Sequence, residues 1–477
     1  MSLYSFMFLK RIVMLYKIRE LMLLISVSII VGTGCRKHDE IIPLQNTSAH
    51  SSEAKTENDA GRFDSYVAQS WYSLMMKLIV ETPGHTPPIA ARSFAYTGVT
   101  LYEALVGEMS NHYSLVGQLN GLTSIPQRVY GNSYLAPVTA NAALARIIKD
   151  LFQNASAANL GRIDSLESAN VNLYVGRISE QIINRSRDYG RVVADAVFNW
   201  SRTDGGDQAY LHNFPADHIP PVGMDKWVPT PPLFQHAMLP YWGNNRPMVS
   251  ANNSGPIDPP DSPSFSTSPG SAFYAAAYEV YNTGLQLSAE EKTIALYWAD
   301  GGGTFTPPGH NLAITLQAIR NHNLTLNEAA MLLAKVGIAE NDAGIVCWRA
   351  KYVVNLLRPV TFIRSYINSA WAPLITTPPF PSYTSGHSTF SGACATILTA
   401  EIGDQISFTD SSKISYGFAP RSFRNFKEAA QEAAISRLYG GIHYKFDNVN
   451  GFNCGQLVAR NVEHLNWGKS NSQIPSD

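Results

Sequence analysis

Apolar residues recur at spacings of three and four along most of this 477-residue chain. This spacing is typical of helices that bury one face, and strand-like alternation is scarce. The segments that show the pattern are Phe63 to Ile79, Pro88 to Val106, Ala136 to Phe152, Ile178 to Trp200, Glu290 to Ala299, Leu326 to Leu357, His387 to Ile402 and Asn425 to Tyr439. We therefore predict a mainly helical protein.

Local signals fix some of the helix ends. Ser288 and Glu291 have the spacing of a capping box, and Gly403 is a predicted helix stop. Between Asp204 and Gly270 the sequence turns to Pro, Gly, Asn and Ser, but it also holds the aromatic residues Trp227, Phe234, Tyr241 and Trp242. These aromatics give the segment surface to bury, so we predict a long ordered crossover between two helical layers.

The first 35 residues have the composition of an export signal. Basic residues precede an apolar run from Leu21 to Val31, and small residues then lead to Cys35. This order predicts a bacterial lipoprotein signal peptide over 1–35, with an uncleaved anchor as the alternative. Polar residues over 36–61 predict a flexible tether. We expect an exported protein, lipid-anchored through Cys35 at the cell envelope.

Charge and cysteine usage exclude other classes. Lys and Arg number 36 and Asp and Glu 37, so the formal net charge is −1 and no overall field recruits nucleic acid. Hydrophobic residues make up 45% of the chain, which is enough for one large domain or two packed halves. The spacings of Cys347, Cys394 and Cys454 match no zinc pattern, so we predict buried free thiols.

The first candidate for chemistry is KYVVNLLRP, which holds Lys351 and Arg358. Seven residues are close to two helical turns, so the spacing predicts two cations on one helix face, with Pro359 at the end of that helix. Two cations on an apolar face are costly unless an anion lies opposite them. Two side chains snorkelling at a helix end would give the same pattern.

The second candidate is Ser385-Gly386-His387, which follows a Pro-rich stretch and precedes a run of small residues. At a helix start these residues offer backbone N–H groups, a hydroxyl and the positive end of the helix dipole to one anion. An ordinary helix cap followed by an incidental histidine is the alternative.

The third candidate is SRLYGGIHYKFD, residues 436–447. Arg437 would end a helix that Gly440-Gly441 breaks, and His443 would follow on the turn. Asp447, four residues later, can accept a hydrogen bond from one imidazole nitrogen and leave the other basic. A nucleophile or a metal ligand needs that arrangement, although a purely structural pair remains open.

The three segments together supply three cations, helix-start donors and two histidines. Lys351, Arg358 and Arg437 suit a tetrahedral oxyanion of roughly two to three negative charges. Phosphate and vanadate both qualify.

The combined pattern resembles the signature of the vanadium haloperoxidase and type 2 phosphatidic acid phosphatase superfamily. That signature is a lysine, six residues and Arg-Pro; then Ser-Gly-His; then Ser-Arg, five residues, His, three residues and Asp, and every spacing is intact here. Similarity to the soluble, chloroperoxidase-like haloperoxidases runs from about Pro87 onward, through PPIAARSFAYTGVTLYEAL, ALYWADGGGTFTPPGH and DAGIVCWRAK.

The resemblance implies a role for each matched residue. His443 would bond vanadium in a peroxidase or attack phosphorus in a phosphatase, and His387 would be the acid–base group. Asp300 matches an aspartate that pairs with an active-site arginine, whereas Trp348 and Phe380 match aromatics that line the halide pocket. The oxyanion would be held by Lys351, Arg358, Arg437, Ser385 and Gly386, with Lys351 also polarising bound peroxide.

Two positions fall outside this transfer. Thr384 stands where the family usually has proline, which would loosen the loop without removing a ligand. His310, in PPGHN, matches no motif position, so we expect a loop histidine.

The resemblance also implies an all-α fold of helical bundles: two packed four-helix-bundle-like halves with long Pro/Gly-rich loops, and a site at the helix ends of the second bundle. The domain would span 62–477, with a catalytic core at about 285–465. Because no apolar run after Val31 reaches the roughly 20 residues of a membrane span, the soluble branch is favoured over integral lipid phosphatases.

Three functions follow as hypotheses. The first is a vanadate-dependent haloperoxidase that oxidises halide with hydrogen peroxide to hypohalous acid. The second is an acid phosphatase that hydrolyses phosphomonoesters through a phosphohistidine at His443. The third, a non-catalytic lipoprotein that binds glycans, gives no reason for three cations and two histidines at these spacings.

Overall fold

Every periodic segment of the sequence forms a helix. The structure is a computed structural model that describes residues 60–253 and 258–468. The helices that the periodicity predicts are α2 (Tyr66–Glu81), α3 (Pro87–Leu105), α4 (Ala136–Leu151), α6 (Glu180–Ser201), α8 (Ala289–Tyr297), α10 (Leu326–Val354), α12 (Gly386–Ile402) and α13 (Phe426–Tyr439). Each of these segments has a continuous apolar stripe, which makes the helix predictable from the sequence. The observed ends lie within a few residues of the predicted ones.

Further helices form where apolar residues show no clear helical period. They are α5 (Ala157–Asn172), α7 (Ala272–Leu285), α9 (Thr306–Asn321), α11 (Pro359–Tyr366) and α14 (Lys445–Glu463). Most of α5 is polar and exposed, so it lacks an apolar stripe. The prolines that open α9 and α11 suggest loops, but proline is well tolerated in the first helical turn.

Short elements connect the helices. The 3₁₀ turns are η1 (Ala60–Arg62), η2 (Val106–Glu108), η3 (Ala209–Leu211), η4 (Trp242–Asn244), η5 (Ser250–Asn252) and η6 (Ile414–Tyr416). Strands β1 (Phe408–Asp410) and β2 (Arg421–Phe423) pair antiparallel, with Phe408 opposite Phe423 and Asp410 opposite Arg421. Helices therefore dominate the part of the chain that the structure describes, as the predicted all-α class requires.

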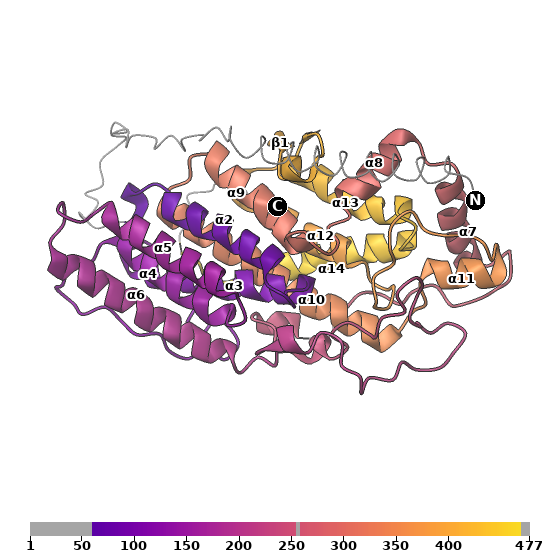
Figure 1. Ribbon diagram of the computed structural model, residues 1–477, viewed down its shortest axis with the longest axis horizontal. Helices are drawn as coiled ribbons and strands as arrows, with labels where there is room; N and C mark the ends of the chain where they lie inside the picture. Colours follow the sequence, from indigo (N-terminus) through magenta and orange to yellow (C-terminus); the bar gives the residue numbers. More distant parts are fainter. Residues whose placement is uncertain (1–59, 254–257, 469–477) are drawn as a thin grey trace, which may run out of the picture. The chain divides into compact units, whose positions relative to one another are not determined.

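The helices form two bundles that share α10 (Figure 1). In the first bundle α2, α3, α4, α5 and α6 pack on one another, and in the second α12 packs against α9, α13 and α14, while α8 packs on α13. The long helix α10 packs along α3 on one side and along α12 and α14 on the other. Because it faces both bundles, it is buried around nearly its whole circumference. The predicted packing of two bundle halves is confirmed.

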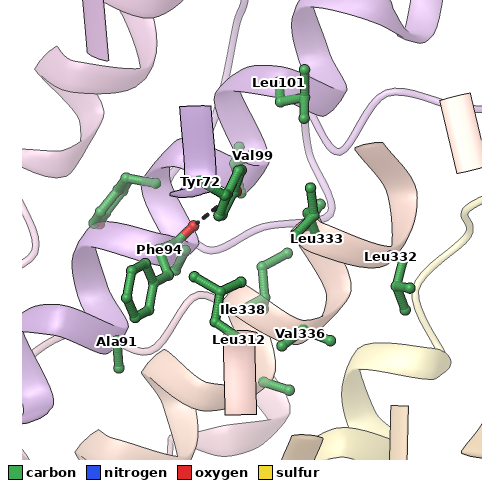
Figure 2. Packing of buried hydrophobic residues seen from close by; sticks show 14 of the residues in the cluster. Tyr72, Ala91, Phe94, Val99, Leu101, Leu312, Leu332, Leu333, Val336 and Ile338 are labelled. Atoms are coloured by element: carbon green, nitrogen blue, oxygen red, sulfur yellow. Dashed lines mark hydrogen bonds between the residues drawn. The ribbon is translucent and has the colours of Figure 1, made fainter. Parts of the chain in front are cut away.

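The contact between α3 and α10 brings the two backbones close together. Figure 2 shows Phe94 and Val99 of α3 beside Leu333 and Ile338 of α10. A Cβ at Gly98 would lie 2.7 Å from the Leu333 carbonyl oxygen, so only glycine permits this approach. The shared core thereby fixes α10, the helix that carries Lys351.

The predicted ends of two helices are confirmed. Ser288 and Glu291 form the capping box at the start of α8, and α12 stops at Gly403, whose φ is 132°. Cys347, Cys394 and Cys454 are buried and form no disulfide within the described part of the chain.

In the described part of the segment from Asp204 to Gly270, the helical elements are all 3₁₀ turns. Trp227 and Trp242 are buried as predicted, whereas Phe234 and Tyr241 remain 62% and 49% exposed. The segment bonds to the loops that follow α10: the Trp227 N–H donates to the Asn355 carbonyl at 2.7 Å. The crossover therefore braces the backbone just before Arg358.

The signal peptide, the tether up to residue 59 and the lipid site at Cys35 lie outside the described residues and stay predictions. Among the residues that the structure does describe, no helix has both the length and the apolarity to cross a bilayer.

Candidate functional site

His443 lies on the turn between α13 and α14, and a new helix beginning at Lys445 brings Asp447 back beneath it. The distance from His443 Nδ1 to Asp447 Oδ2 is 2.8 Å. A carboxylate can only accept, so Nδ1 carries the hydrogen and Nε2 presents its lone pair. Burial, followed by the charges of Arg358 and Lys351, holds the pKa of His443 well below its usual range. The imidazole is therefore neutral, as a metal ligand or nucleophile must be.

Asp447 is itself fixed by neighbours. Its Oδ2 accepts hydrogen bonds from the Ser382 hydroxyl and from the Tyr444 N–H. Burial raises the pKa of Asp447 to about 6, so the carboxylate is ionised at neutral pH. The predicted pairing of Asp447 with His443 is formed in the structure.

Arg358 reaches the same point from another element. Its Nη1 lies 3.0 Å from His443 Nε2 and 2.8 Å from the Ile442 carbonyl oxygen, and its Nε donates to the Phe380 carbonyl at 2.7 Å. Burial lowers the pKa of Arg358 to about 10, which leaves it charged at neutral pH.

The prediction that Lys351 and Arg358 share one helix is wrong. Helix α10 ends at Val354 because Asn355 adopts a left-handed φ of 53°, and Arg358 is the residue that precedes α11. Pro359 begins α11 instead of ending α10, since proline fits the first position of a helix. The two cations still converge, at 4.8 Å and 4.9 Å from the centre of the Phe380 ring.

Lys351 is fully buried and points at backbone carbonyls. Its Nζ donates to Pro381, Ser382 and Thr384 carbonyl oxygens, the first two at 3.0 Å and 3.1 Å. Burial lowers the pKa of Lys351 to about 7. The lysine therefore holds the loop before α12 in place and is poised between its charged and neutral forms.

Ser385, Gly386 and His387 open α12 as predicted. Ser385 is the N-cap and its hydroxyl accepts from the Ser388 N–H, while its own N–H donates to the Asp447 carbonyl at 3.1 Å. The His387 ring donates to the Ala299 carbonyl, and burial and Arg437 hold its pKa well below the usual range. The bond from Ser385 to Asp447 thus ties the N-terminus of α12 to the first turn of α14.

Arg437 is buried on the last turn of α13, and Gly440 and Gly441 end that helix as predicted. Its Nη2 donates to the Ala295 carbonyl at 3.3 Å, and its Nε to the Ser436 hydroxyl at 2.9 Å. Burial lowers the pKa of Arg437 to about 10, so the charge is retained.

The expected direct pairing of Asp300 with an arginine is wrong. Asp300 instead accepts from His310 at 2.9 Å and from Lys413. Arg437 senses the Asp300 charge without an ion pair being formed. His310 is also not a loop residue, since it lies in α9 and is fully buried.

Trp348 and Phe380 pack against each other with ring centres 5.1 Å apart. Trp348 is buried and bonds through Nε1 to the Met238 carbonyl at 3.3 Å, whereas Phe380 is 8% exposed. Both lie beside Lys351, so they form the apolar wall next to the cations. Their predicted role in halide binding stays a prediction.

Ser382, Asp410 and Lys413 were missed by the sequence analysis. Ser382 holds Asp447, and the other two belong to the polar network around Asp300. A hydroxyl in a Pro-rich loop and charged residues beside short strands are common, so no local signal identifies them.

The donor set fits a tetrahedral oxyanion. Among the described residues, Arg358 Nη2 and His387 Nε2 are buried without a hydrogen-bond partner, which is costly unless a ligand pairs with them. In the same part of the chain no three His, Cys, Asp or Glu side chains gather as a cage for a bare cation. One neutral imidazole surrounded by cations suits vanadate or phosphate.

Comparisons with known proteins agree with this chemistry. The family model described as the VCPO second helical-bundle domain matches residues 331–467. Vanadium chloroperoxidase of Curvularia inaequalis is 26% identical over 220 residues, which cover 32% of this chain and 35% of that relative. The match therefore spans about a third of the curated relative.

Solved structures extend the likeness. A bacterial vanadium-dependent iodoperoxidase is 33% identical, with a TM-score of 0.76, over 84% of this chain and 96% of that chain. The holo and apo forms of a bacterial vanadium-dependent chloroperoxidase are 14% identical, with TM-scores of 0.61 and 0.62 over 79% and 80% of this chain and 91% and 93% of theirs. At that identity the chloroperoxidase supports the fold alone.

Proposed function

Because this chain belongs to the vanadium-dependent haloperoxidase family, we propose that it binds vanadate and oxidises a halide with hydrogen peroxide to hypohalous acid. The observation that carries the proposal is His443, held neutral by burial with its Nε2 lone pair beside Arg358. We propose iodide as the first halide to test, because the relative that is 33% identical is an iodoperoxidase.

Each residue of the site has a role in this proposal. Nε2 of His443 would bind vanadium, and Asp447 keeps the imidazole in the tautomer that leaves this nitrogen free of hydrogen. Bound vanadate supplies Lewis-acid activation of peroxide for oxygen transfer to the halide. The oxyanion charge would be balanced by Arg358, Arg437 and Lys351, together with donors from Ser385 and Gly386.

His387 would move the proton. Its bond to the Ala299 carbonyl uses one ring nitrogen, and the buried Nε2 is left to exchange a proton with peroxide or product. Trp348 and Phe380 would exclude water from the side of the site where the halide enters.

The same donors also suit phosphate, so hydrolysis of phosphomonoesters is the competing function. The test uses purified protein stripped of metal, assayed with peroxide and iodide and then bromide, before and after addition of vanadate. Hydrolysis of p-nitrophenyl phosphate by the stripped protein is measured in parallel.

Halide oxidation that requires vanadate and disappears in His443→Ala is the expected result. Phosphate release by the stripped protein, inhibited by vanadate and without halide oxidation, would show that the chain is a phosphatase. A control variant, His322→Ala, changes an exposed histidine and should keep full activity.

A further inference from the structure

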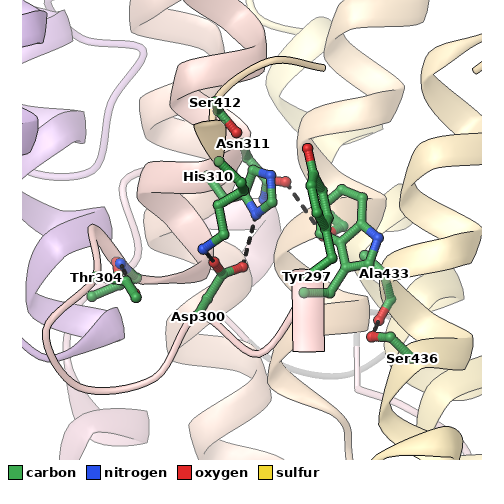
Figure 3. Close-up of polar contacts among 12 residues, drawn as sticks. Tyr297, Asp300, Thr304, His310, Asn311, Ser412, Ala433 and Ser436 are labelled. Carbon is green, nitrogen blue, oxygen red and sulfur yellow. Dashed lines mark hydrogen bonds and ion pairs between the residues drawn. The ribbon is translucent and has the colours of Figure 1, made fainter. Parts of the chain in front are cut away.

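Behind the oxyanion site lies a buried histidine that the proposed chemistry does not use. His310 is fully buried, and each of its ring nitrogens faces a carboxylate. Nδ1 lies 2.9 Å from Asp300 Oδ2 and Nε2 lies 2.8 Å from Asp410 Oδ2. Figure 3 shows the ring above Asp300, with Tyr297 alongside.

This geometry fixes the protonation of His310. An ionised carboxylate has no hydrogen to give, so both ring nitrogens must donate and the ring is an imidazolium. Burial opposes the charge, but the Asp300 and Asp410 carboxylates outweigh it and raise the pKa of His310 to about 9. The positive charge in turn holds the pKa of both aspartates well below the usual range despite their burial.

A fourth charge completes the group. Lys413, with 2% of its side chain exposed, donates to Asp300 Oδ1. We call these four residues, Asp300, His310, Asp410 and Lys413, the Asp300 cluster. Its two positive and two negative charges cancel, as a buried group requires if it is not to be costly.

Neutral side chains fix the cluster in place. The Tyr297 hydroxyl donates to Asp410 Oδ2 at 2.7 Å, and the Gln317 amide donates to Asp410 Oδ1 at 3.3 Å. The Trp298 ring stacks on His310 with centres 4.4 Å apart. Since α8, α9 and the β1 segment each contribute, the cluster locks these three elements together.

The cluster is linked to the site through Ala299, the residue that precedes Asp300 in the chain. The Ala299 carbonyl, one residue before Asp300, accepts the hydrogen bond from His387. The Asp300 charge also acts on Arg437. Asp300 thus bonds to His310 and Lys413, while its charge acts on both His387 and Arg437.

We propose that His310 is a positioning residue of the active site, which acts through the Asp300 cluster to fix the negative charge that faces His387 and Arg437. The proposal rests on the proposed function in taking His387 as the acid–base group. It goes beyond that function because His310, Asp410 and Lys413 touch none of the oxyanion ligands.

The charges that face His387 come from several elements. Arg437 on α13 and His310 on α9 lower its pKa, while Asp300 and the Ala299 carbonyl raise it. His443, before α14, is neutral in the ligand-free site and interacts with His387 as well. Removing one cation from the Asp300 cluster therefore exposes His387 to an unbalanced carboxylate and should favour its protonated form.

The test measures the histidine titrations directly. Histidine labelled with ¹³C at Cε1 is followed by NMR from pH 4.5 to 9.5 in vanadate-free protein, with signals assigned by substitution of single histidines. His310→Gln should raise the pH at which His387 titrates by about one pH unit, the effect of one charge at short range. Lys413→Gln should shift it in the same direction, and Lys413→Arg, which keeps the charge, should leave it in place.

A double variant separates charge from packing. His310→Gln with Asp410→Asn restores a net charge of zero and leaves the pair of Asp300 and Lys413 intact. If the cluster acts through charge, the titration of His387 returns toward its wild-type position, and the pH profile of iodide oxidation follows. A merely structural His310 would make the double variant at least as defective as the single one.

An unchanged His387 titration in both His310→Gln and Lys413→Gln would overturn the proposal. If His310→Gln fails to fold, the comparison of Lys413→Gln with Lys413→Arg decides the question. The protein could also show the expected shifts of the His387 titration and yet oxidise no halide. That result would refute the proposed function but leave the role of the cluster intact.

Discussion

Arg358 Nη1 lies 3.0 Å from His443 Nε2, although 85 positions separate the two residues in the chain. The guanidinium faces the lone pair that the bond from His443 to Asp447 leaves free of hydrogen. A fixed positive charge beside this lone pair disfavours protonation, so the imidazole stays neutral and ready to bind an electrophilic centre. The balance between these three side chains gives the first prediction.

Asp447→Asn should weaken vanadate binding by about 10- to 100-fold, the usual effect of losing a carboxylate behind a metal-binding histidine. The amide N–H of the variant can donate to Nδ1 of His443. Nε2 would then carry the hydrogen, which would point at the positively charged Arg358. Equilibrium dialysis with elemental analysis of vanadium measures the affinity. The exposed Asp404→Asn is the matched control and should bind normally, whereas equal affinity in both variants would contradict the tautomer argument.

Oxyanion affinity should fall as pH rises through about 7. Burial lowers the pKa of Lys351 to about 7, so the cation prevails below that pH and the neutral amine above it. Vanadate affinity, measured from pH 6 to 8.5, should fall in wild-type protein by more than the titration of vanadate itself accounts for. Lys351→Met should bind less tightly throughout and lack this extra dependence, while Lys445→Met, at a side chain 61% exposed, should match wild type. Parallel curves for wild type and Lys351→Met would rule out the lysine as the titrating group.

Gly441→Ala should destabilise the protein more than Gly417→Ala. Both glycines have a left-handed φ, 76° and 86°, so an alanine at either position costs about 1 kcal/mol of strain. A Cβ at Gly441 would also lie 3.1 Å from Pro373 and Trp371 atoms, whereas a Cβ at Gly417 meets nothing within 4 Å. Urea unfolding compares the two. Only Gly441→Ala should reduce activity, because the turn at Gly441 presents His443. Equal losses of unfolding free energy in the two variants would show that the contact of the new Cβ with Pro373 and Trp371 is unimportant.

Stability should fall below pH 6.5 partly because of His85. Its ring is buried and stacked on Phe152 with centres 4.2 Å apart. Burial lowers the pKa of His85 from 6.5 to about 4, so between these values the unfolded chain binds the proton and the folded chain does not. The contribution of His85 is complete above pH 6.5, and about 3 kcal/mol of it is lost by pH 4.

His85→Phe keeps the stacking and removes the titration. Its unfolding free energy, measured in urea at pH 7.5 and 4.5, should fall less on acidification than that of wild type. The exposed His322→Phe should behave as wild type does. If His85→Phe loses as much stability as wild type does, His85 is not a source of the acid sensitivity.

Helices with a strong apolar period, and side-chain pairs within one or two turns of chain, can be predicted from the order of residues alone. Asp447 lies beneath His443, the capping box joins Ser288 to Glu291, and Gly440-Gly441 ends α13. Such pairs are set by 3.6 residues per turn and by the φ preferences of glycine, which act locally. The spacing of the three segments also supplied the candidate donors of the oxyanion site.

Which distant groups meet depends instead on how the helices pack. A left-handed Asn355 separates Lys351 and Arg358 into different elements, and helix packing nevertheless brings both to the Phe380 ring. The same packing places His310 between two carboxylates 10 and 100 positions away. Charged side chains far apart in the chain have no local spacing that reveals their partners, because those partners are chosen by how the bundles pack and by the need to neutralise buried charge.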